Sequence, residues 1–180
     1  MAELNRQTTE QVDTPKIYVA CLAAYNNGHL HGRWIHAVQS VDEINAEIRA
    51  MLKASPIPNA EEYAIHDYEG FEGTEISEYC GIEEAAQLAE FIEERGKLGA
   101  ELLNHFCGDR GEAEAAFDNY AGEYRSLADL AEELTSETTQ IPKSLVNYID
   151  YEAMGRDMEL GGDVFTIEAG FEQIHIFWSR

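Results

Sequence analysis

Histidines are the first side chains of this sequence that could act as metal ligands or general bases. His29 and His31 could face one metal ion, but they lie beside a glycine-containing turn without convergent carboxylates. His66 and Asp67 are neighbours in a predicted strand, so their side chains point to opposite faces and cannot easily pair as a base and its orienting acid. We therefore predict no metal site and no catalytic histidine.

Cysteines are equally sparse. Cys21, Cys80 and Cys107 are too few and too widely spaced for a disulfide framework or a close-spaced zinc motif. Cys107 lies near His105, but no recognisable catalytic motif surrounds the two residues. The sequence thus predicts no cysteine-based catalysis and fits a reducing compartment.

The many acidic residues could also bind calcium, which needs oxygen ligands at loop positions 1, 3, 5 and 12. A loop starting at Asp67 has Phe71 at position 5, and a loop starting at Asp109 has Gly111 at position 3 and Tyr120 at position 12. Both fail the pattern, and there is no phosphate-binding glycine loop. Paired carboxylates for glycoside chemistry stay open, although so many acids produce close pairs by chance. We expect that the protein binds no cofactor and is not an enzyme.

Net charge is the most informative property of the chain. Its 180 residues include 35 acidic and 12 basic side chains, a formal charge of −23. Such a charge repels nucleic acids and anionic membranes and favours basic partners. Residues 1–60 carry a net charge of −1, residues 61–140 carry −18 and residues 141–180 carry −4. Adaptation to high salt would spread the acidity more evenly, whereas a merely solvated acidic face remains an alternative.

The composition predicts a folded protein, because 44 % hydrophobic and 10 % aromatic residues exceed what a disordered acidic tail contains. The first 15 residues are polar and lack the apolar core of a signal peptide. No apolar run approaches the roughly 18 residues that span a bilayer. We expect a cytoplasmic location.

The first part of the chain has the pattern of a small α+β unit. Strands are predicted at Ile17–Tyr25, Arg33–Val38 and Glu62–Phe71. Between them, Ser40 and Glu43 form a capping box that opens a helix with Ile44, Ile48, Met51 and Leu52 at core spacing. Proline then ends that helix.

The middle of the chain is helical and acidic. Residues 82–95 place Ala85, Leu88, Ala89 and Ile92 on one face, and Glu83, Glu90 and Glu94 on the opposite face. Shorter helices are predicted at Ala100–Phe106 and Glu112–Tyr120.

Ser126 is predicted to cap a helix with a leucine stripe on one side and carboxylates on the other. A helix at Ser144–Met154 and a β-hairpin around Gly170 complete the predicted elements.

Ordered carboxylates on a rigid scaffold suggest a target that normally neutralises phosphates. Arginines and lysines line protein grooves that bind DNA. Duplex DNA carries about two charges per 3.4 Å of its axis, so a chain of −23 has the charge of roughly a dozen base pairs.

Three stretches resemble the ArdA antirestriction family of plasmids, conjugative transposons and phages. They are IYVACLAAYNNGHLHGRWIHA, EEYAIHDYEGF and IPKSLVNYIDYEAMGRDMELGGDVFTIEAGFEQIHIF, and the match covers about Lys16–Trp178. The resemblance is specific in YAIHDYE and NYIDYEAMGRD. It implies a DNA mimic that inhibits type I restriction–modification enzymes by occupying the DNA-binding groove of their specificity and methylase core.

The resemblance also implies an α+β fold of three small units in an elongated dimer. We expect a polar tail at 1–15, an N-terminal sheet with a helix at 16–74, a central acidic helical bundle at 75–121, and a C-terminal sheet with helices at 122–180. The carboxylates expected to form the DNA-mimic surface are Glu61, Glu62, Asp67, Glu69, Glu72, Glu83, Glu90, Glu94, Glu112, Asp118, Asp129, Glu132, Glu133 and Glu137.

A homodimer also follows from the last apolar stretch, FEQIHIFW, if that strand forms an unprotected sheet edge; a central strand over its own helices is the alternative. The second functional hypothesis is an acidic adaptor or chaperone-like partner of another basic DNA-binding protein. Competition with duplex DNA for a restriction enzyme separates the two hypotheses.

Overall fold

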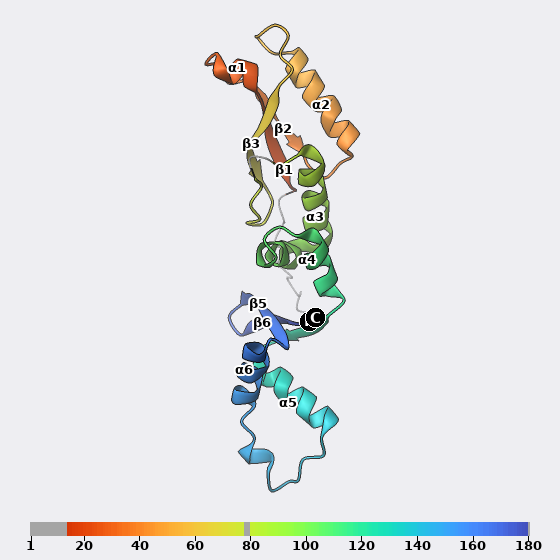
Figure 1. The fold of residues 1–180 in the computed structure, drawn as a ribbon, viewed down its shortest axis with the longest axis vertical. Coiled ribbons are helices and arrows are strands. Elements are labelled where there is room, and N and C mark those ends of the chain that lie inside the picture. Colours follow the sequence, from red (N-terminus) through yellow and green to blue (C-terminus); the bar gives the residue numbers. More distant parts are fainter. Residues whose placement is uncertain (1–13, 78–79, 180) are drawn as a thin grey trace, which may run out of the picture. The chain divides into compact units, whose positions relative to one another are not determined.

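The computed structural model describes residues 14–77 and 80–179 (Figure 1). The chain divides into two compact units: unit 1 ends at Arg110 and unit 2 begins at Gly111. Each unit contains helices and a three-stranded antiparallel sheet, which confirms the predicted α+β class. The expected division into three units in series stays a prediction, and the expected polar tail lies almost wholly outside the described residues.

The sheet of unit 1, sheet A, has the strand order β2-β1-β3, with β1 at Lys16–Cys21, β2 at Gly32–His36 and β3 at Tyr63–Glu69. The predicted strand Ile17–Tyr25 was too long, because Leu22–Asn26 forms the short helix α1. Cys21 ends the strand by capping that helix, its Sγ accepting from the backbone N–H of Ala24 at 3.5 Å.

Helix α2 at Val41–Lys53 contacts β1 and β2 of this sheet (Figure 1). The predicted capping box is present: Ser40 Oγ accepts from the Glu43 N–H at 3.3 Å, and Glu43 Oε2 accepts from the Ser40 N–H at 3.1 Å. Ile44, Ile48 and Met51 are buried at the predicted helical spacing.

Helix α3 occupies Ile82–His105 and is interrupted at Gly96, whose φ of 62° and ψ of −155° are not helical. The interruption separates the predicted helix 82–95 from the predicted shorter helix that follows. Helix α4 then runs over Arg110–Phe117. The predicted apolar face of α3 is confirmed, since Ala85, Leu88, Ala89 and Ile92 are all buried.

The sheet of unit 2, sheet B, has the strand order β4-β6-β5, with β4 at Tyr120–Tyr124, β5 at Val164–Gly170 and β6 at Gln173–Trp178. The predicted C-terminal hairpin is confirmed by the β5–β6 pairing. Strand β4 was not predicted, because glycine within a short segment weakens the strand signal. Since β4 pairs with β6, the last strand is central, and the edge-strand argument for a dimer was wrong.

Two helices cover one face of sheet B: α5 at Leu127–Thr138 and α6 at Tyr151–Gly161. Leu130, Val164 and Ile176 form the buried core between these helices and the strands. The predicted cap is confirmed, as Ser126 Oγ accepts from the Asp129 N–H at 3.3 Å.

The predicted helix Ser144–Met154 began too early. A short 3₁₀ helix, η1, occupies Val146–Tyr148, and α6 begins only at Tyr151. Asp150 sets that start, because its Oδ1 accepts from the Ala153 N–H at 2.9 Å and so satisfies a free backbone donor.

Candidate functional site: a surface of exposed carboxylates

Carboxylates cover both units. Counted over the full sequence, unit 1 has 20 acidic and 8 basic side chains and unit 2 has 15 and 4, giving net charges of −12 and −11. No carboxylate within residues 14–77 and 80–179 is buried, and only Glu47, Glu72 and Glu101 of them are half-buried. Thirteen of the fourteen carboxylates expected from the sequence are therefore exposed, with Glu72 as the exception.

The first group of expected carboxylates belongs to β3 and the segments that flank it. Asp67 and Glu69 lie two residues apart on one face of the strand, opposite Tyr18 and Lys16 of β1. Lys16 Nζ donates to Glu69 at 3.0 Å and partly neutralises it. Asp67 accepts from the backbone N–H of Tyr68 at 2.8 Å, which fixes its carboxylate.

Helix α3 presents the second group. Glu83, Glu90 and Glu94 fall within about 40° of one another around the helix axis and are exposed. Sequence reasoning missed their neighbours Glu84 and Glu93, which are also exposed and widen the acidic face to roughly half of the helix circumference. The helix tolerates this like-charge repulsion because its opposite face is buried.

Cys80, just before α3, shows the effect of these charges. Its partial burial and the neighbouring carboxylate of Glu84 raise the pKa of its thiol to about 12. The thiol therefore stays protonated at neutral pH, and this cysteine is a poor nucleophile.

The third group of expected carboxylates lies in unit 2, on α5 and at the start of the unit. Asp129, Glu132, Glu133 and Glu137 are exposed on α5. Burial raises the pKa of the Tyr124 hydroxyl. The negative charge of Glu133, to which this hydroxyl is hydrogen-bonded, raises that pKa further, as does the charge of Glu137. Glu112 and Asp118, from α4 and the turn after it, are exposed as well.

Helix α6 and the C-terminal hairpin carry carboxylates that were not expected to belong to the surface. The charge count by segment placed the acidity in residues 61–140, but Glu152, Asp157 and Glu159 of α6 are also exposed, as is Glu168 of β5. The charge count did not single them out, because acidic residues are less frequent in this part of the sequence. Their exposure extends the acidic surface of unit 2 beyond α5.

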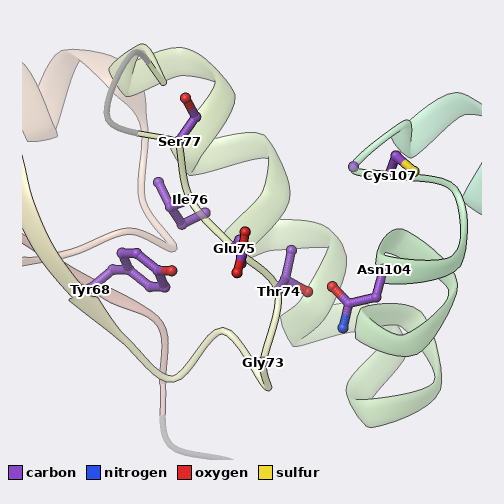
Figure 2. Close-up of a pocket in the computed structure, with 9 residues that line it drawn as sticks. Tyr68, Gly73, Thr74, Glu75, Ile76, Ser77, Asn104 and Cys107 are labelled. Carbon is purple, nitrogen blue, oxygen red and sulfur yellow. The ribbon is translucent and has the colours of Figure 1, made fainter.

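A cavity of about 710 Å³ lies in unit 1 between the segment after β3 and the end of α3 (Figure 2). Figure 2 shows Tyr68 on one side, Asn104 and Cys107 on the other, and the Gly73–Ser77 segment between them. No histidine is found among the described residues that line it, so Cys107 has no imidazole base there. The lining provides hydrogen-bonding groups without a recognisable catalytic arrangement.

Within the described ranges, no three histidine, cysteine, aspartate or glutamate side chains converge to hold a metal ion. Among those residues there is also no helix with the length and apolar character that a membrane crossing requires.

Comparison with known families supplies the remaining finding. A family model described as "Antirestriction protein (ArdA)" matches residues 17–173. No curated protein sequence matches the chain closely enough to count as a relative. The match runs from the second residue of β1 to the first residue of β6, so it covers all the helices described above and most of both sheets, without the rest of β6.

Proposed function

The chain belongs to the ArdA family of antirestriction proteins, and from this premise we propose that it inhibits type I restriction–modification enzymes as a mimic of duplex DNA. In this mechanism its carboxylates take the places of phosphates in the groove where the specificity and methylase core binds DNA. The protein acts by occupying that groove and catalyses no reaction. It acts in the cytoplasm, where these enzymes meet DNA.

The exposure of the carboxylates is the observation that supports this proposal most directly. An acidic chain could pair its carboxylates internally, but here they face solvent on a framework held by two apolar cores. Lys16 pairs with Glu69 of the expected set, whereas the ion pairs of Arg33 with Glu47 and of Arg125 with Glu172 use carboxylates outside that set. A groove built to neutralise phosphates would attract such a surface.

Binding energy in this mechanism is distributed over many weak contacts. Changing one exposed carboxylate, for example Glu90→Gln, should cost roughly 0–1 kcal/mol. A single such change that abolished inhibition while the fold stayed intact would indicate an active site and contradict groove occupation.

A homodimer is part of the proposal, since two copies would provide a longer acidic surface. Because β6 is a central strand, the homodimer is now supported by the segment between α5 and α6. There Leu145, Val146 and Tyr148 are 52 %, 45 % and 84 % exposed, and no acidic residue occurs between Thr138 and Ile149. Large exposed apolar side chains of this kind mark association surfaces. Light scattering at micromolar concentration should give twice the chain mass, and Tyr148→Ser should weaken the dimer.

The decisive experiment is a calorimetric titration of a type I methylase with this protein, with and without the cognate DNA duplex. We expect duplex and protein to exclude each other. The affinity of the protein should fall as salt rises, with a shallower slope than that of DNA, because discrete carboxylates condense fewer counterions. Binding that leaves the DNA in place, or that is indifferent to salt, would favour an acidic adaptor of another basic protein.

A further inference from the structure

One face of sheet A carries an exposed tryptophan. Alternate residues of a strand point to opposite faces of the sheet, and Ile35 of β2 is buried. Arg33 shares the face of Ile35 and pairs with Glu47 of α2 at 3.3 Å, so this is the face that α2 covers. Trp34 lies between Arg33 and Ile35, so its indole points to the other face, where it is 41 % exposed. Aromatic side chains are enriched where proteins bind partners, so this face is a candidate binding surface.

Three side chains form a row across the Trp34 face. Tyr18 of β1 is directly opposite Trp34 of β2 on one side and Asp67 of β3 on the other. Directly opposite residues of antiparallel strands share a face and lie close together. The ring centroids of Tyr18 and Trp34 are 5.5 Å apart. We name Trp34, Tyr18 and Asp67 the aromatic–acid row.

The row is held in place by the strands beneath it. A Cβ at Gly32 of β2 would lie 2.7 Å from the Tyr18 hydroxyl oxygen, so the glycine leaves the space that the Tyr18 ring occupies. Asp67 is exposed, and its Oδ1 accepts from the Tyr68 N–H at 2.8 Å. Because the strands already position the side chains of the row, binding there would cost little conformational entropy.

Charge on this face decides which kind of group the row can bind. The contact of Asp67 with a backbone N–H leaves the negative charge of its carboxylate in place. In the neighbouring row of the sheet, His36 and Glu69 lie on either side of Lys16, and Lys16 Nζ donates to Glu69 at 3.0 Å. The nearest lysine is thus directed to Glu69. An ionised carboxylate beside two aromatic rings favours a cation as the bound group.

Among protein cations, arginine suits this row better than lysine. A guanidinium group is planar, donates two parallel hydrogen bonds to one carboxylate and stacks on aromatic rings. An ammonium group is compact and strongly hydrated, and it stacks less well. An arginine that pairs with Asp67 could lie over the Tyr18 ring and place its aliphatic stem on Trp34.

We propose that the aromatic–acid row binds an arginine side chain from the DNA-binding groove of the restriction enzyme. The inference rests on the function proposed above and names the partner side chain for one part of the acidic surface. A helix-surface carboxylate such as Glu90 accepts lysine or arginine alike. The aromatic–acid row selects arginine, because only the guanidinium group uses the carboxylate and the rings together.

The first test is a double-mutant cycle in the methylase titration. Trp34→Thr and Asp67→Asn should each weaken binding roughly tenfold, whereas Glu90→Gln should weaken it by less than about fivefold. Because one arginine contacts both side chains, the double variant should lose much less than the roughly hundredfold of two independent contacts. A double loss equal to the product of the single losses would overturn the proposal, as would single losses no larger than that of Glu90→Gln.

Two further variants control for folding and for exposed apolar surface in general. Trp34→Phe keeps a ring on the same face, so it should bind within about threefold of the wild type. Leu30, on the loop between α1 and β2, is 93 % exposed and lies outside the row, so Leu30→Ser should bind as the wild type does. An equal loss of affinity in Trp34→Phe and Trp34→Thr would overturn the proposal.

The second test uses the protein alone and two peptide probes of equal charge, hexa-arginine and hexa-lysine. NMR observes the indole N–H signal of Trp34, which Trp34→Phe identifies by its loss, and that of Trp178, the other tryptophan, as the reference. We expect hexa-arginine to shift the Trp34 signal at a several-fold lower concentration than hexa-lysine, and Asp67→Asn to remove this difference. Equal shifts of the Trp34 signal with both peptides would overturn the proposal.

These measurements separate the row from the proposed function. If the wild type competes with duplex for the methylase while Trp34→Thr and Asp67→Asn behave as independent contacts, the aromatic–acid row alone is refuted. If the wild type does not compete with duplex, the proposed function is refuted, and the assignment of the arginine to the groove is refuted with it.

Discussion

Sheets A and B have similar architectures, but the helices that cover them carry different surface charges. Each has three antiparallel strands, a buried central strand and helices on one face, yet the central strand is the first of the chain in sheet A and the last in sheet B. The helix on sheet A, α2, has three acidic and two basic residues, whereas α5 on sheet B has four acidic residues and no basic one.

This difference indicates that surface charge and architecture are set independently here. Burial of Ile17 and Ile35 in sheet A and of Ile176 and Phe177 in sheet B supplies apolar cores of the same kind. Charged side chains occupy exposed positions, where they change the folding free energy little but determine which partner is attracted. The acidity of unit 2 can therefore serve binding without dictating its fold.

The largest expected effect comes from the central strands. Ile17→Ala in β1 and Ile176→Ala in β6 each remove a fully buried side chain and should destabilise their unit by about 2–5 kcal/mol. Unit 2 contains no cysteine, so labelling of the buried Cys21 reports on unit 1 alone. Mass spectrometry should find faster Cys21 labelling in Ile17→Ala and unchanged labelling in Ile176→Ala.

Two other thiols in unit 1 provide the controls for that measurement. Cys107 is exposed and should label first in every variant, whereas Cys80, with its pKa of about 12, should label slowly at pH 8. Equal acceleration of Cys21 labelling in both core variants would mean that the two units unfold together, and the comparison of two separate sheets would fail.

A smaller effect is expected from two glycines that allow close packing. A Cβ at Gly155 of α6 would lie 2.7 Å from the backbone carbon of Leu127, and one at Gly32 of β2 would lie 2.6 Å from the Val19 carbonyl oxygen. Gly155→Ala and Gly32→Ala should each cost about 1–3 kcal/mol in thermal unfolding. Gly81→Ala, where a Cβ meets nothing within 4 Å, should leave the melting temperature nearly unchanged.

Charge neutralisation should affect binding and spare stability. Glu132→Gln/Glu137→Gln on α5 should weaken inhibition of a type I enzyme several-fold and flatten its salt dependence, because two exposed contacts worth up to about 1 kcal/mol each are lost. Asp42→Asn/Glu47→Gln on α2 is the matched pair and should inhibit as the wild type does. Adding Glu83→Gln, Glu90→Gln and Glu94→Gln should deepen the first effect, and similar behaviour of both pairs would contradict charge mimicry.

The smallest expected effect is a pH-dependent helix cap. Hydrogen bonds from the Ser40 side chain and backbone hold the pKa of Glu43 below its ordinary value of 4.5. The resulting stabilisation is present above that value and is lost as the pH falls through the lower pKa of the folded state. Ser40→Ala should therefore differ from the wild type by about 1 kcal/mol at neutral pH and by less in acid.

Ser126→Ala is the counterpart in unit 2, because Ser126 caps α5 by its own side chain. Its cost at neutral pH should be similar, about 1 kcal/mol. Urea unfolding at pH 7 and pH 3 measures both variants. If the loss of stability in Ser40→Ala grew in acid, the assigned lowering of the Glu43 pKa would be wrong.

Local signals in the sequence predicted much of the fold. The capping residues Ser40 and Ser126 and the helical spacing of Ile44 and Ile48 depend on interactions within a few residues, and the structure confirms them. The start of α6 was misplaced because Asp150 caps it, a signal that competed with a plausible start six residues earlier. Strand β4 was missed because its hydrogen bonds come from β6, some fifty residues away in sequence.

The candidate surface shows the same division. Helical periodicity predicted the exposed face of Glu83, Glu90 and Glu94, because an ionised group is rarely buried, but it missed the equally exposed Glu84 and Glu93. The exposure of Leu30 could not be predicted in that way. The loop that carries Leu30 is held by contacts with distant segments, such as the hydrogen bond of His31 to the Met51 carbonyl.

By itself, the sequence determined the class of fold, the family and the acidic character of the surface, since all three follow from residue types and short-range patterns. Only the tertiary structure decided that β6 is a central strand, that Gly155 allows Leu127 to pack closely and that Leu30 stands in solvent. The reason is physical: strand order and close packing arise from contacts between distant segments, whose free energy depends on the geometry of both partners.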